Sequence, residues 1–130
     1  MVSLTLEQIL QLHALVLVKD GGADGVRDVG RLEAAVSTQH QVVFGEELYA
    51  TVFAKAAALM RGIISDHPFA DGNKRTAILA GLTLLEVNGY NFTAQRGELE
   101  NFTVRAAIDH LDIDAIADWL KRHSRDVSMV

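Results

Sequence analysis

The sequence predicts an all-α fold in one compact domain that spans residues 1–130. Apolar residues recur at helical spacing through most of the chain, and the glycine-richest stretch, 20–25, separates two such segments. No repeat, low-complexity segment or linker interrupts the pattern. A chain of this length buries roughly two thirds of the surface that its unfolded form exposes, so it can build one core.

The first predicted helix starts with a capping box, in which Thr5 is followed three residues later by Gln8. Its apolar pattern stops near Lys19, and the glycines that follow indicate a loop. Asp28 is expected to cap a short helix that runs to Val36. The apolar face of the first helix consists of Leu6, Ile9, Leu10, His13, Leu15 and Leu17.

Four further helices are predicted along the rest of the chain. Helical spacing of apolar residues indicates one from Glu46 to about Ile64. The segment 76–88 is apolar on nearly every side, so we expect it to be the central buried helix. Two weaker patterns cover about 97–110 and 112–123. The sequence therefore predicts about six helices around one central helix.

Composition excludes several classes of function. The formal net charge of −5 argues against direct binding along a nucleic-acid backbone, which requires clustered Lys and Arg. No uncharged apolar run reaches the roughly 18 residues that a membrane span needs, so no membrane partner is expected. The N-terminus lacks the features of a secretion signal, and the chain has no cysteine. We expect a cytoplasmic protein.

The run from His67 to Arg75, HPFADGNKR, lies between two predicted helices, so its backbone passes from a loop into a helix N-terminus. Unpaired N–H groups and the positive end of the helix dipole suit a phosphate there. Gly72 lets an anion approach the backbone, and the side chains of Asn73, Lys74 and Arg75 add one neutral and two cationic donors. The sequence therefore predicts a phosphate site.

Two side chains of the same run have the chemistry that a transfer reaction needs. Asp71 is an oxygen ligand beside the phosphate donors, which is how Mg²⁺ is usually held. His67 can accept a proton from an incoming hydroxyl. Each residue also has a structural interpretation, with His67 at a helix end, Asp71 as a cap, and the two cations on a solvated face. The presence of all of them in one window favours the functional interpretation, with Phe69 as an apolar anchor.

This run resembles the signature of the Fic family, HPF followed by two residues and then GN, a variable residue and R. Lys74 at the variable place and Thr76-Ala77 after the arginine resemble the Doc branch, the death-on-curing toxins. The likeness implies a Fic-like helical domain. It extends to further Doc-like segments, which are Gly21-Gly22, Gly25 to Asp28, Leu32-Glu33, Phe44 to Tyr49, Asn88 to Tyr90 and Trp119-Leu120.

The resemblance implies that His67 is the general base for a protein hydroxyl and that Asp71 is the Mg²⁺ ligand. It also implies that the phosphates of ATP are bound by Gly72, Asn73, Lys74 and Arg75. Lys74 replaces a glycine and Ile78 replaces an arginine of the AMP-transferring Fic pattern. Resemblance to the Doc branch implies that ATP is bound in the reverse orientation to that in the AMP-transferring pattern. It then implies transfer of the γ-phosphoryl group to a Ser or Thr. In Doc the target is elongation factor Tu, and translation stops.

The resemblance also implies a partner, a small antitoxin whose disordered C-terminal segment folds into a groove on the toxin. The sequence does not place that groove. Two other functions remain open, AMP transfer to a protein hydroxyl and a non-catalytic module that binds a nucleotide or a partner. Arg27 belongs either to a loop that flanks the substrate or to simple helix-end chemistry beside Asp28.

Overall fold

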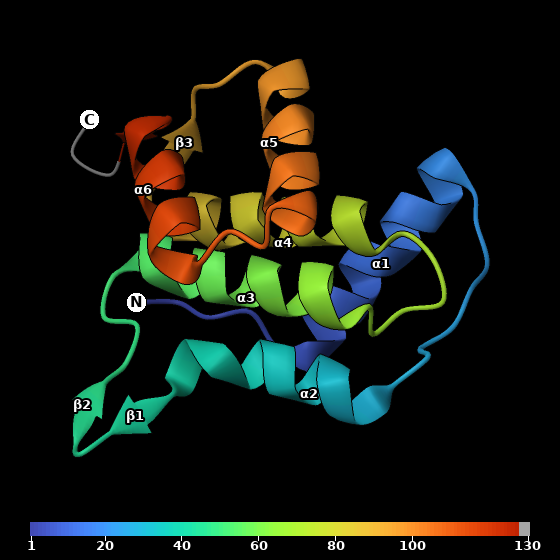
Figure 1. Ribbon diagram of the computed structural model, residues 1–130, viewed down its shortest axis with the longest axis horizontal. Helices are drawn as coiled ribbons and strands as arrows, with labels where there is room; N and C mark the ends of the chain where they lie inside the picture. The colour runs from blue at the N-terminus through green and yellow to red at the C-terminus, as the bar shows by residue number, and fades with distance from the viewer. Residues whose placement is uncertain (128–130) are drawn as a thin grey trace.

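Six α-helices build the part of the chain that the structure describes, residues 1–127 of a computed structural model (Figure 1). The all-α class predicted from the sequence is confirmed. The helices are α1 (Leu6–Asp20), α2 (Val29–Ser37), α3 (Val52–Asp66), α4 (Asn73–Val87), α5 (Arg96–Ile108) and α6 (Ile113–Arg122), with a 3₁₀ turn η1 (Thr38–His40) after α2. None of these helices is long and apolar enough to cross a membrane.

Four helices begin at a side-chain cap. The predicted capping box of Thr5 and Gln8 is present, and Asp28 accepts a hydrogen bond from the backbone N–H of Arg31 at 3.0 Å. Thr51 and Asp112 cap α3 and α6 in the same way. The N-cap of α4 is Gly72, which offers no side chain to the first turn. This difference leaves the start of α4 open to an external anion.

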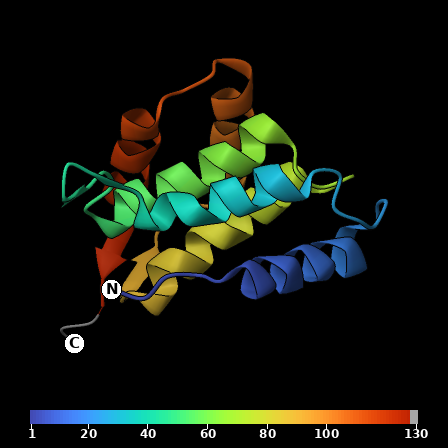
Figure 2. The same ribbon diagram turned by 90° about the horizontal axis from the view of Figure 1, so that it is seen from below.

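The centre of the fold is the antiparallel pair α3 and α4, which lie side by side in both ribbon views (Figures 1 and 2). α3 also packs against α2 and α6, and α4 packs against α1 and α5. The predicted central helix α4 buries residues such as Ala77, Ala80 and Leu84, whereas Ile78 and Leu82 are half-buried. α3 therefore carries the larger share of the core.

The helix predicted from Glu46 begins six residues later, at Val52. Residues Val42–Val43 (β1) and Glu46–Glu47 (β2) form an antiparallel hairpin instead, with Phe44 and Gly45 in left-handed conformations at its turn. The helical spacing of apolar residues continued through this segment and concealed the turn. A second antiparallel pair, Tyr90–Phe92 (β3) with Ser124–Asp126 (β4), was also not predicted.

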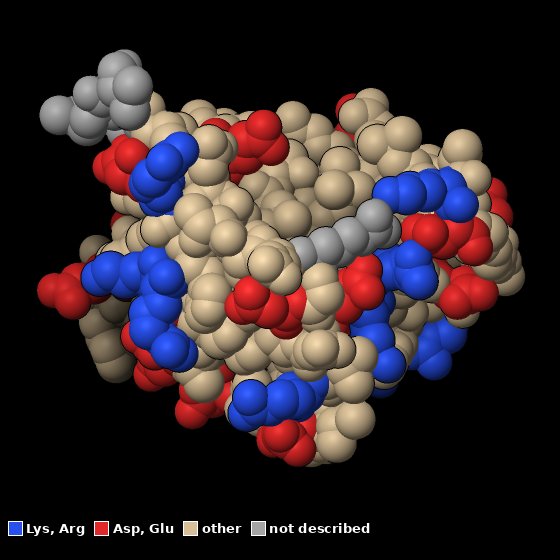
Figure 3. Space-filling view, turned by 90° about the horizontal axis from the view of Figure 1, so that it is seen from above, with Lys and Arg blue, Asp and Glu red and all other residues tan. Residues whose placement is uncertain are grey.

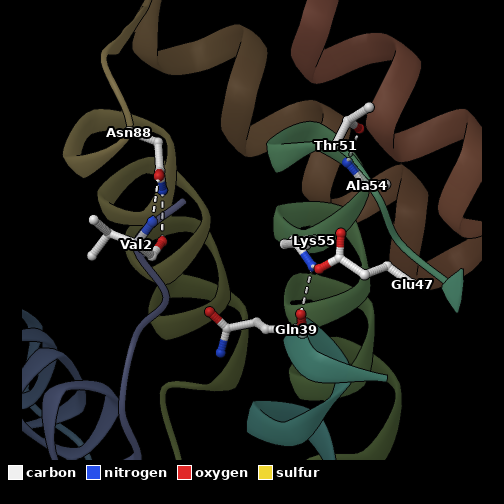
Figure 4. A network of polar contacts seen from close by, with 7 residues as sticks. All are labelled: Val2, Gln39, Glu47, Thr51, Ala54, Lys55 and Asn88. Carbon is white, nitrogen blue, oxygen red and sulfur yellow. Dashed lines mark hydrogen bonds and ion pairs between the residues drawn. The ribbon is translucent and has the colours of Figure 1, made fainter. Parts of the chain in front are cut away.

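A buried lysine anchors the hairpin to the core (Figure 4). The ammonium group of Lys55 donates to the backbone carbonyl of Gln39 at 2.7 Å and to Glu47 Oε1 at 3.0 Å. The Gln39 side chain in turn accepts from the N–H of Leu4 and donates to the carbonyls of Leu4 and Val36. These bonds satisfy the buried ammonium group of Lys55 and the buried side-chain amide of Gln39, and they tie the hairpin to α3 and to the turn after α2.

Positive and negative side chains are interspersed on the face seen from above in Figure 3. Lys and Arg lie beside Asp and Glu there. Among the described residues of that face, basic side chains are therefore mixed with acidic ones.

Candidate active site at the N-terminus of α4

The six residues 67–72 reverse the chain between α3 and α4. His67 ends α3 in the left-handed conformation, with φ 45° and ψ 59°, and Gly72 begins α4 with φ 76°. Pro68 and Phe69 are buried between them, while His67 and Asp71 are exposed. The middle of the loop is therefore anchored in the core, whereas the predicted base His67 and the predicted metal ligand Asp71 remain accessible.

Phe69 is the anchor of this loop, as the sequence predicted. Its ring is 1% exposed and stacks on the imidazole of His13 from α1, with ring centroids 3.8 Å apart and an angle of 9° between the planes. The amide side chain of Asn73 accepts from the Phe69 N–H and donates to the Phe69 carbonyl, both at 3.0 Å. Asn73 was predicted to bind phosphate. Its side-chain amide holds the loop here, and these two bonds leave its backbone N–H and the second hydrogen of Nδ2 for an anion.

The N-terminus of α4 has the properties of an anion site. The backbone N–H groups of Asn73, Lys74 and Arg75 lie in the first turn, where no carbonyl four residues earlier can pair with them in an α-helix. Gly72 supplies no capping side chain, and a Cβ at this position would lie 3.2 Å from Val16 Cγ1. The side chains of Lys74 and Arg75 are exposed beside these donors. Together they provide backbone donors, a helix dipole and two cations.

The Asp71 carboxylate is held by backbone amides on both sides. Oδ1 accepts from the N–H of Gly72 at 2.9 Å, and Oδ2 accepts from the N–H of Ala23 at 3.3 Å. Gly22 packs so closely that a Cβ on it would lie 2.8 Å from Oδ2. Each carboxylate oxygen retains a further lone pair, so Asp71 fits a Mg²⁺ ion that takes its remaining ligands from phosphates and water. Among residues 1–127 no cluster of three or more His, Cys, Asp or Glu offers a metal site built from protein alone.

Arg27, whose role the sequence left open, caps the C-terminal end of α3. Its Nε donates to the carbonyl of His67 at 2.9 Å and its Nη2 to the carbonyl of Asp66 at 3.1 Å. Arg31 donates to the same Asp66 carbonyl. This is helix-end chemistry, but at α3 rather than at the α2 start where Asp28 lies. Arg27 thereby holds the backbone of the candidate base.

The predicted phosphate ligand Arg75 is paired with a carboxylate from α1. Arg75 Nη1 lies 2.8 Å from Asp20 Oδ1, and the arginine side chain remains more than half exposed. Two cations in the first turn of a helix are unfavourable by themselves, and Asp20 offsets part of that cost. An exposed ion pair contributes about 0–1 kcal/mol, so a phosphate can compete for the guanidinium.

The structure thus brings every predicted site residue to one loop and the first turn of α4. Sequence reasoning missed the residues that support them, which are His13, Asp20 and Gly22. His13 had been counted only as part of an apolar face. A histidine at a core position needs a hydrogen-bond partner, and that requirement is the signal that could have singled it out.

The model of the Fic/DOC family matches residues 3–85, a range that contains α1, the 21–28 segment and the whole loop. The chain belongs to the Fic/Doc family. It is 38% identical over 99 residues to Toxin Doc of Mycolicibacterium smegmatis, a match that covers 75% of this chain and 76% of that protein. It is 33% identical over 116 residues to Protein kinase doc of Escherichia phage P1, covering 89% of this chain and 90% of the phage protein.

Replacement of Gly72 by alanine tests the anion site at the N-terminus of α4. A left-handed alanine costs about 1–2 kcal/mol, and its Cβ would press on Val16. We expect Gly72→Ala to lower the free energy of unfolding by roughly that amount, measured by urea denaturation, and to weaken ATP binding measured by calorimetry. Gly97→Ala in α5 is the matched control, because nothing lies within 4 Å of its Cβ. Equal effects of the two substitutions would contradict this account.

Proposed function

We propose that this protein transfers the γ-phosphoryl group of ATP to a Ser or Thr hydroxyl of a target protein, as the toxin of a toxin–antitoxin module. The observation that carries the proposal is the uncapped first turn of α4, with Lys74 and Arg75 beside it and with His67 and Asp71 exposed on the preceding loop. The names of the two relatives, a Doc toxin and a Doc protein kinase, support the same class of activity.

The reaction assigns a separate task to each part of the site. The first-turn N–H groups, Lys74 and Arg75 bind and neutralise the phosphates. The oxygen of the target hydroxyl bonds to the γ-phosphorus, and the bond between the γ-phosphorus and ADP breaks. His67 accepts the proton that this hydroxyl loses. Asp71 would hold Mg²⁺, which supplies charge neutralisation between the phosphates when it is bound.

Two side chains favour phosphoryl transfer over AMP transfer. A lysine at position 74 fills space and adds charge where a glycine would let an α-phosphate lie against the backbone. At position 78, one turn further along α4, a half-buried isoleucine stands instead of a second arginine. Both features change how the phosphates are held and support an ATP bound with its γ-phosphate toward His67.

By family resemblance the proposed target is elongation factor Tu in the cytoplasm, and its modification would stop translation. The test incubates purified protein with Mg²⁺, ATP and elongation factor Tu and records the intact mass of the target. We expect a phosphate-sized gain, and we expect His67→Ala to slow it by roughly a hundredfold to ten-thousandfold, since a general base contributes about that much. Circular dichroism confirms that the variant is folded.

Other masses would overturn parts of the proposal. An AMP-sized gain would show that the argument from Lys74 is wrong and that the protein is an adenylyltransferase. No gain on any target, combined with nucleotide binding that His67→Ala leaves unchanged, would show a non-catalytic module. Full activity in His67→Ala would remove this residue from the role of base.

A pocket of about 500 Å³ between α1, α4 and α5 is a candidate binding groove for the antitoxin. We propose that it receives the C-terminal segment of the antitoxin as an amphipathic helix. The pocket is mainly apolar, and its lining also includes Asp20 and Arg75, the ion pair beside the proposed phosphate site. Such a partner therefore reaches a phosphate ligand directly. The apolar lining residues are Leu15, Val16, Ile78, Leu79, Leu82, Phe92, Ala94 and Leu99.

Two exposed residues of α1 provide a matched test of this groove. Leu15 is 60% exposed and lines the pocket, whereas Val18 is 88% exposed and does not. We expect Leu15→Glu to weaken the complex with the antitoxin of the module at least tenfold by calorimetry, because a buried apolar contact is replaced by a charge. Val18→Glu is expected to bind normally. Equal binding by both variants would place the antitoxin elsewhere.

A further inference from the structure

His13 is a buried polar residue on the apolar face of α1, and it contacts the catalytic loop in two ways. It is 4% exposed, its ring stacks on Phe69, and its Nε2 lies 2.9 Å from the backbone carbonyl oxygen of Asp71. Because a carbonyl only accepts, Nε2 must carry the proton in this contact. The imidazole therefore donates to the backbone of the proposed metal ligand.

The carbonyl of Asp71 and the N–H of Gly72 belong to one peptide group. In a trans peptide these two bonds point in opposite directions. The carbonyl points inward to His13, so the N–H points outward, where it donates to Asp71 Oδ1 at 2.9 Å. Rotation of this one peptide group would break both hydrogen bonds. His13 thus acts on the carboxylate through the peptide that links Asp71 to Gly72.

The close approach of α1 supports this arrangement. A Cβ on Gly72 would lie 3.8 Å from His13 Nε2 and 3.2 Å from Val16 Cγ1, so the turn rests directly on α1. Phe69, Asp71 and Gly72 therefore all lie against one side chain. The partner that satisfies the buried imidazole is the backbone of the proposed metal ligand, so the same bond that satisfies His13 also holds the Asp71–Gly72 peptide.

We propose that His13 is a positioning residue for the transfer reaction. It fixes the Asp71–Gly72 peptide, which orients the Asp71 carboxylate toward the phosphate site. This inference rests on the proposed function for the roles of Asp71 and the α4 N-terminus, but the conformation of the peptide can be measured without any ligand.

Two substitutions separate the ring from the donor. His13→Phe keeps an aromatic ring for Phe69 and removes the N–H, whereas His13→Gln keeps an N–H donor and removes the ring. Ile9→Val, one turn earlier and fully buried, is the control for a general loss of packing on α1. The measurements are amide hydrogen exchange at Gly72 without nucleotide, binding of Mn²⁺ with ATP, and thermal unfolding.

In His13→Phe we expect the hydrogen of the Gly72 amide to exchange at least tenfold faster than in the wild type. We also expect this variant to bind Mn²⁺–ATP roughly threefold to tenfold more weakly, which is the size expected for one lost hydrogen bond. His13→Gln should retain most of both properties. Ile9→Val should lower only the unfolding temperature. In an Asp71→Asn background, His13→Phe should weaken Mn²⁺–ATP binding no further, because the effect passes through the carboxylate.

Wild-type exchange and wild-type affinity in His13→Phe would overturn the proposal, as would an additive loss in the Asp71→Asn background. If His13→Phe does not fold, the proposal is tested by the tautomer of His13 in the wild-type protein. Nitrogen chemical shifts of the wild-type imidazole should show a proton on Nε2, and an unprotonated Nε2 would refute the contact. If the wild type binds no Mn²⁺–ATP, the proposed function fails, while the exchange of the Gly72 amide still tests His13.

Discussion

The burial of Phe69 is the constraint on which the site depends. The chain must reverse between two packed helices in six residues, and a buried aromatic ring at the middle of that turn fixes its path. The backbone groups of Phe69 would be costly if unpaired, and the Asn73 side chain satisfies both. With the middle fixed, the residues on either side can be exposed and still be held in place.

A second set of contacts supports the same loop from outside the motif. The N–H groups of Arg27 and Asp28 donate to the Pro68 carbonyl, and the N–H of Ala70 donates to the Gly25 carbonyl. A left-handed histidine at position 67 costs about 1–2 kcal/mol, and the hydrogen bonds from Arg27 to the end of α3 offset that strain. The glycine-rich segment after α1 is therefore part of the site's scaffold rather than a simple linker.

Local signals explain how much of this could be predicted from the sequence. The caps at Thr5 and Asp28 depend on residues a few positions apart, and the sequence predicted both. The candidate base, metal ligand and phosphate donors occupy one short run, so their proximity was also predictable. The start of α3 was not, because the hairpin before it depends on Lys55, whose partners Gln39 and Glu47 lie 16 and 8 residues away along the chain.

The residues that support the site from other parts of the chain could not be predicted for the same reason. His13 lies 58 residues before Asp71, and Arg27 lies 40 before His67, so no spacing in the sequence links them. Asn73 shows the converse case. Its type and position suggested a ligand, but a side-chain amide can also pair with both polar groups of a nearby backbone residue, and only the folded loop shows that it does.

The roles proposed for the site residues all require that phosphates bind at the first turn of α4. A larger hollow of about 710 Å³ lies at the other end of α3, around Thr51 to Phe53, and it offers a competing place for a ligand. Titration of ¹⁵N-labelled His67→Ala protein with Mg²⁺–ATP, followed by amide chemical shifts, distinguishes the two. We predict that the largest changes fall on the amides from Gly72 to Arg75. Changes concentrated at the start of α3, with none at α4, would contradict the account.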